Sequence, residues 1–154
     1  MVLRDLFGAV SEGPGYNVFA HSGGRWLTPG RGTLAGITRR SMIELAREAG
    51  QQVDEGTLTA ADLLGSDEIL VTSRAGGIMP VTVVDGKPVG TGAPGPLTRK
   101  LRDLYWASHQ DPRYSIHPGP LLKACPDGSC RTGGLPAPYH GSRAHRGTHG
   151  HQPT

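Results

Sequence analysis

Gly36, Ile37 and Thr38 place a glycine and a hydroxyl side chain at the start of a helical pattern. The first backbone N–H groups of a helix have no acceptor within it, and the helix dipole adds positive potential at the same point. Gly36 permits close approach to the backbone, and Thr38 adds a hydroxyl donor. This segment therefore predicts a binding site for an anion such as phosphate. A role for Thr38 as an N-cap is compatible with that prediction.

Two further segments offer polar groups in turns. Taken alone, Glu12 in Ser-Glu-Gly reads as a solvent-exposed turn residue, and Arg74-Ala75-Gly76 reads as a tight turn with small residues. Neither turn specifies a reaction without further context.

The last forty residues contain every cysteine and most of the histidines of the chain. Four residues separate Cys125 from Cys130, whereas a zinc site needs close ligand pairs on an ordered scaffold. Four of the histidines are scattered among Gly, Arg and Pro at positions 140, 145, 149 and 151. We therefore expect no metal site.

Charge and composition divide the chain into two unlike parts. Residues 1–114 carry as many acidic as basic side chains, so the net charge of +3 comes from residues 115–154. That second part is rich in Gly, Pro and His and has no Phe or Trp, a composition that predicts disorder. A basic excess confined to such a tail does not indicate a nucleic-acid partner. No run of apolar residues is long enough for a membrane span, and we expect a cytoplasmic protein.

Hydrophobic periodicity predicts a mixed α/β (α+β) domain that can position these groups. Strands are expected over residues 2–6, 16–20, 25–28 and 68–73, with a hairpin of 79–84 and 87–89 across Asp85-Gly86. Helices are expected from Thr38 to the stop at Gly50, from Thr59 through a capping-box-like start, and from Pro96 to Ser108.

Four ordered segments resemble the class IV (fold-type IV) aminotransferases, which use pyridoxal 5′-phosphate. They are SEGPGYNVF (11–19), LAGITR (34–39), AGGIMPV (75–81) and GPLT (95–98). Each is weak alone, but their order and spacing together are specific. The resemblance is to branched-chain amino-acid aminotransferases and amine transaminases, with Tyr16 leaning towards the latter. It implies that residues 1–114 are part of the C-terminal cofactor-binding domain of that fold.

The resemblance assigns roles to the candidate residues. Glu12 matches the acid beside the pyridine nitrogen of the cofactor, and Gly36, Ile37 and Thr38 match its phosphate-binding segment. Arg74 and Ala75 match a second phosphate-binding turn, where Arg74 replaces the usual threonine. An arginine there could bind phosphate more strongly or crowd the cofactor out, and we favour impairment. Ala75 and Gly76 match residues whose backbone N–H groups hold a substrate carboxylate.

The family's Schiff-base lysine has no counterpart in this sequence. The three lysines of the chain are Lys87, Lys100 and Lys123, and none matches its position. The sequence therefore predicts a truncated aminotransferase that is inactive alone and has no catalytic residue of its own. The family reaction would move an amino group from a branched-chain amino acid or related amine to a 2-oxo acid, in a homodimer.

Two alternatives stay open. The chain could derive from an aminodeoxychorismate lyase-like member of the superfamily, because the same cofactor site serves both reactions. It could also be a non-catalytic, degenerate chain.

Overall fold

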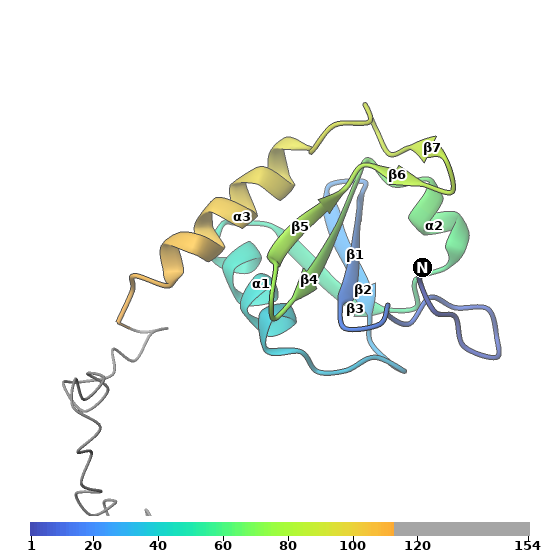
Figure 1. Ribbon diagram of the computed structural model, residues 1–154, viewed down its shortest axis with the longest axis horizontal. Coiled ribbons are helices and arrows are strands. Elements are labelled where there is room, and N and C mark those ends of the chain that lie inside the picture. The colour runs from blue at the N-terminus through green and yellow to red at the C-terminus, as the bar shows by residue number, and fades with distance from the viewer. Residues whose placement is uncertain (113–154) are drawn as a thin grey trace, which may run out of the picture. The chain divides into compact units, whose positions relative to one another are not determined.

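The computed structural model of the chain describes residues 1–112, which form one compact unit (Figure 1). The predicted disordered segment 115–154, with its cysteines and four of its histidines as candidate metal ligands, lies outside the described residues. None of the helices within residues 1–112 is long and apolar enough to cross a membrane.

A five-stranded sheet forms the centre of this unit. Its order is β3-β2-β1-β4-β5, with β2 and β3 parallel and all other neighbours antiparallel. The strands are β1 (Asn17–Ser22), β2 (Arg25–Pro29), β3 (Gln52–Gly56), β4 (Glu68–Ser73) and β5 (Gly77–Val81). The β1–β2 hairpin and β4 confirm the predictions from the sequence, and β1 is the central strand.

Helices cover the two faces of the sheet (Figure 1). On one face, α1 (Ile37–Glu48) and α3 (Pro96–Ser108) pack on the sheet around Phe19, Met42 and Leu101. On the other, Leu63 from the short α2 (Ala60–Leu64) packs with Val18 and other apolar residues of β1 and β4. Alternate residues of one strand therefore enter different cores, as the pleat of a strand requires.

Three sequence predictions need correction. Residues 2–6 form no strand: only single bridges join Arg4 to Val10 and Val10 to Leu58, and the nearby Phe7 is 94% exposed. The polar strand β3 was not predicted, because Val53 is its only buried side chain. It forms because the α1 crossover brings it beside β2. The predicted strand 79–84 is divided between β5 and β6.

The second hairpin is separate from the main sheet. Strands β6 (Val83–Val84) and β7 (Lys87–Pro88) pair across Asp85 and Gly86. Both turn residues have positive φ, 49° and 74°, as expected for the Asp-Gly turn that the sequence predicted.

Each of the two helices α2 and α3 has an acidic acceptor at its start. In α2, Thr59 and Asp62 form the predicted capping box, which lowers the pKa of the Asp62 carboxyl through hydrogen bonds from the Thr59 side chain and backbone. In α3, the buried carboxylate of Glu68 accepts from Leu97 N at 3.1 Å and from Thr98 N at 2.8 Å. A Cβ on the N-cap residue Gly95 would lie 2.0 Å from that carboxylate carbon.

Removing the Glu68 carboxylate is expected to destabilise the fold. Glu68→Ala leaves two backbone N–H groups and the Thr98 hydroxyl without their acceptor, at a cost of about 1.5–3 kcal/mol. Chemical denaturation measures this loss. Glu68→Gln keeps an oxygen acceptor and should lose less, and Asp67→Asn on the adjacent exposed side chain should change stability by no more than about 0.5 kcal/mol. Equal stability of Glu68→Ala and wild type would refute the cap.

Candidate functional site

A cleft of about 570 Å³ opens between the start of α1, the start of β1 and the end of β4. It brings together five of the candidate residues predicted from the sequence. They are Glu12, Gly36, Ile37, Thr38 and Arg74. Asn17, Thr72, Ser73 and Tyr105 are further lining residues. Glu12 and Arg74, which are 62 positions apart in the chain, thus line one cavity.

Glu12 is half-buried and held at one carboxylate oxygen. Its Oε2 accepts hydrogen bonds from Leu34 N at 2.7 Å, Thr33 Oγ1 at 3.0 Å and Asn17 Nδ2 at 3.2 Å. Within residues 1–112, all hydrogen bonds to this carboxylate reach Oε2. The side chain is therefore oriented by the protein while Oε1 remains available to a bound group.

Asn17 connects Glu12 to the segment that leads into α1. It is only 5% exposed, and its Nδ2 also donates to Thr33 Oγ1 and to the Leu34 carbonyl, each at 2.9 Å. A Cβ at Gly36 would lie 2.4 Å from Asn17 Oδ1. Gly36 therefore lets the Asn17 amide pack against the backbone at the helix start.

The predictions from the sequence did not assign Asn17 a role. One signal was present: a polar amide stands beside Val18 and Phe19 in an otherwise apolar strand. Buried polar groups need partners, but which partners Asn17 has depends on how three separate loops come together.

The start of α1 is open to a ligand. Its N-cap is Gly36, which has no capping side chain, and the first turn has no acidic residue. Thr38 is inside the helix and not the N-cap that we considered, and its hydroxyl donates to the Ser73 carbonyl at 3.2 Å. The first-turn N–H groups thus face the cleft without a protein cap, which is the arrangement that binds anions.

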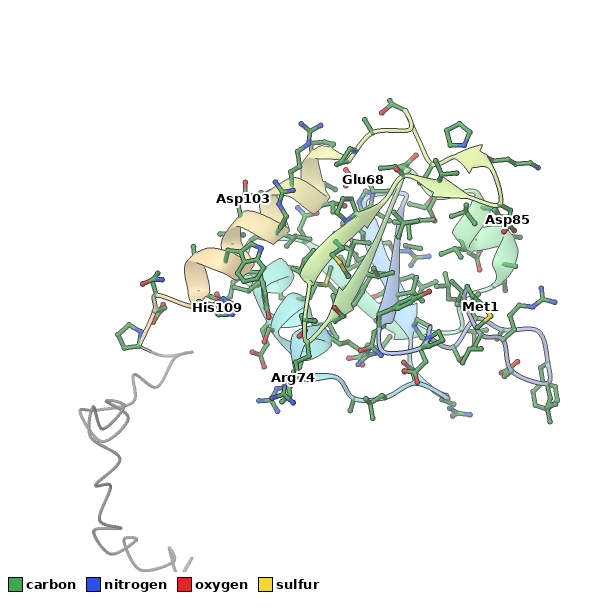
Figure 2. The ribbon with its side chains drawn as sticks, viewed as in Figure 1. Met1, Glu68, Arg74, Asp85, Asp103 and His109 are labelled. Atoms are coloured by element: carbon green, nitrogen blue, oxygen red, sulfur yellow. The ribbon has the colours of Figure 1, made fainter. Side chains whose placement is uncertain are left out.

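The β4–β5 turn contributes less to the cleft than the sequence predicted. Arg74 is exposed and lines the cleft, and Figure 2 shows it at the end of the sheet near the start of α1. Ala75 and Gly76 are not among the lining residues. The Gly76 N–H donates to Ser73 Oγ at 2.9 Å, so this group is already bonded within the turn. The substrate-binding roles of Ala75 and Gly76 stay predictions.

Neither described lysine lies at the cleft. Lys87 is exposed on β7 and Lys100 is exposed on α3, and both are absent from the lining residues. Lys123 lies outside the described residues. Among residues 1–112, no group of three or more His, Cys, Asp and Glu side chains could hold a metal ion.

Comparisons with known proteins all point to one family. The sequence model of amino-transferase class IV matches residues 1–84. D-alanine aminotransferase of Bacillus licheniformis is 38% identical over 104 residues, which are 66% of this chain and 36% of that protein. Branched-chain-amino-acid aminotransferase of Escherichia coli K12 is also 38% identical, over 68% of this chain and 35% of that protein.

Solved structures agree with these sequence matches. The Escherichia coli branched-chain enzyme superposes with a TM-score of 0.67 at 37% identity, over 69% of this chain and 36% of that one. The PLP form of the Thermobaculum terrenum enzyme gives 0.69 at 36% identity, over 73% and 38%. The mixed α/β fold is thus that of fold-type IV aminotransferases over part of their length. The chain spans about a third of the length of these relatives.

The contact between Gly36 and Asn17 generates a test by double-mutant cycle. Gly36→Ala should destabilise the protein by about 1–3 kcal/mol, because the added methyl group displaces the buried amide. The same change in an Asn17→Ala background should cost close to nothing, since the space is then empty. Denaturation of the four proteins provides the measurement. Equal costs in both backgrounds would show that the two residues do not interact.

Proposed function

Because this chain belongs to the class IV aminotransferase family, we propose that its cleft is the cofactor-binding part of an aminotransferase site and takes pyridoxal 5′-phosphate. One observation carries the proposal: an oriented carboxylate, Glu12, and an uncapped helix start, residues 36–38, line the same cleft. The cofactor has complementary groups, a ring nitrogen that carries a proton and a phosphate ester. The structural relatives include one described in its PLP form.

The start of α1 is the proposed phosphate site. Backbone N–H groups of Ile37 and Thr38 supply donors, and the positive end of the helix dipole favours the dianion. Gly36 has no side chain to cover these donors. No acidic residue in the first turn opposes a negative ligand. The residues present therefore fit a phosphate group.

Glu12 is the proposed partner of the ring nitrogen. Pyridoxal phosphate supplies an electron sink when bound, and that sink needs a protonated nitrogen. A carboxylate beside the nitrogen keeps the proton on it through a charge-assisted hydrogen bond. Oε2 is already held by three donors, which assigns the contact with the ring to Oε1.

Arg74 is proposed to extend the phosphate site. Its side chain is exposed at the cleft rather than packed into it. A guanidinium in that position can approach a phosphate as a bidentate donor without displacing it. This favours a contribution to binding over the impairment that its size suggested from the sequence.

The chain by itself is proposed to be catalytically inactive. The lysine that forms the covalent bond to the cofactor has no counterpart in the sequence, and the described lysines lie away from the cleft. The same lysine would move the proton at the substrate carbon. Residues of this chain bind and polarise the cofactor but do not replace that group.

We propose that the complete reaction is transfer of an amino group from a branched-chain amino acid to a 2-oxo acid. Branched-chain enzymes supply several of the similar sequences and structures. A D-alanine aminotransferase is equally similar in sequence, because the shared segment contains the cofactor site. A lyase of the same superfamily or a non-catalytic chain would contain the same segment, so both alternatives stay open.

Pyridoxamine 5′-phosphate is the probe that tests cofactor binding without reacting with surface lysines. We expect saturable binding by calorimetry, and weaker binding of pyridoxamine, which has no phosphate. After incubation with pyridoxal 5′-phosphate and borohydride reduction, mass analysis should find no stoichiometric adduct on one lysine. Absence of binding would refute the proposed site. A single modified lysine would refute the proposed inactivity.

Variants at the two ends of the cleft should separate the contributions of ring and phosphate. Glu12→Gln is expected to weaken pyridoxamine 5′-phosphate binding about tenfold or more while leaving inorganic phosphate binding unchanged. Arg74→Ala should weaken both probes, and more at low salt than at high salt. Lys100→Ala, on an exposed helix face, is the matched control for charge removal. Parallel losses for both probes in Glu12→Gln would contradict its assignment to the ring.

A further inference from the structure

Thr72 has a buried hydroxyl without a partner. The residue lies on β4 and is 1% exposed, yet its Oγ1 has no hydrogen-bond acceptor or donor within reach. A buried polar group without a partner lowers stability, so such groups are rare and call for an explanation. Thr72 is also a lining residue of the cleft, as are Gly36 and Thr38.

The other unpartnered side-chain atoms lie elsewhere. Within residues 1–112 they are His21 Nδ1, Trp26 Nε1 and Arg39 Nε. None of those three residues lines the cleft. Thr72 is therefore the member of this group that a ligand in the cleft could satisfy.

The register of the sheet fixes the face on which Thr72 lies. Thr72 is the direct cross-strand partner of Asn17 on β1, so the two side chains lie on the same face. On that face Phe19 and Leu70 continue into the core beneath α1 and α3. The next residue, Ser73, offers its carbonyl to the Thr38 hydroxyl. Thr72 is therefore the neighbour in sequence of Ser73, which contacts the first turn of α1.

The start of α1 offers hydrogen-bond donors to this end of the cleft, and the Ser73 carbonyl there already accepts from the Thr38 hydroxyl. The first turn of α1 has unpaired N–H groups and no acidic side chain, and the Glu12 carboxylate of the cleft is already held by Asn17 and Leu34. A hydroxyl added to such a set completes a site for an acceptor with several oxygens. A phosphate group is such an acceptor.

We propose that the Thr72 hydroxyl donates a hydrogen bond to the phosphate group bound at the start of α1. This inference rests on the proposed function and adds a side chain from the sheet to a site otherwise built from a helix start and a turn. It also gives the buried Thr72 hydroxyl the partner that it lacks within residues 1–112.

Thr72→Val and Thr28→Val together test the inference. Both replace a buried threonine by an isosteric apolar residue, but Thr28 Oγ1 already donates to the Val18 carbonyl at 2.8 Å. Thr28→Val should therefore lower the unfolding midpoint of the ligand-free chain and leave its affinity for pyridoxamine 5′-phosphate unchanged. Thr72→Val should do the opposite: an equal or higher midpoint, and an affinity about tenfold weaker. Thr72→Ser should retain most of the affinity.

The ligands distinguish the possible outcomes. Pyridoxamine, without phosphate, should bind Thr72→Val and wild type equally. Equal affinity of both proteins for pyridoxamine 5′-phosphate would overturn the inference while leaving the proposed function intact. A midpoint lowered as much as in Thr28→Val would also overturn it, since the hydroxyl would then be structural. If wild type binds inorganic phosphate through Thr72 but not the cofactor, the anion site stands and the proposed function fails. Binding of neither ligand overturns both.

Discussion

The buried amide of Asn17 is the contact on which the geometry of the cleft depends. One side chain donates to the Glu12 carboxylate, to the Thr33 hydroxyl and to the Leu34 carbonyl, and it packs against Gly36. The Asn17 amide thereby sets the position of Glu12 relative to the start of α1 at Gly36. Its own position is fixed because β1 is the central strand and Phe19, two residues further, is fully buried.

The three helices within residues 1–112 differ in how their starts are capped. The starts of α2 and α3 are closed by carboxylates of the chain itself, Asp62 and Glu68. The start of α1 has neither a capping side chain nor an acid. The Arg39 side chain in that turn donates to the Pro29 carbonyl and to the Glu55 carboxylate, each at 2.9 Å. The turn is thus anchored to β2 and β3 while its N–H groups stay exposed to the cleft.

The proposed cofactor cleft forms without a lysine from residues 1–112. The sheet, α1 and the Glu12 turn form this cleft, and its lining residues lie between positions 12 and 74, with Tyr105 in addition. No lysine among the described residues reaches that cleft. Under the proposed function, the affinity of this cleft for the cofactor would come from non-covalent contacts alone.

Local sequence determined much of the secondary structure. The helix of residues 37–48, the capping box of Thr59 and the Asp85-Gly86 turn follow from periodicity and from residue conformational preferences that act within a few positions. The family resemblance, and with it the candidate residues Glu12 and 36–38, was also present in the sequence. Only the tertiary structure could decide the rest, because it depends on partners far apart in the chain. The polar strand β3 forms only beside β2. Glu68 accepts hydrogen bonds from a helix start only because α3 begins next to it. Asn17 and Thr72 reach the cleft only because β1 and β4 pair in this register.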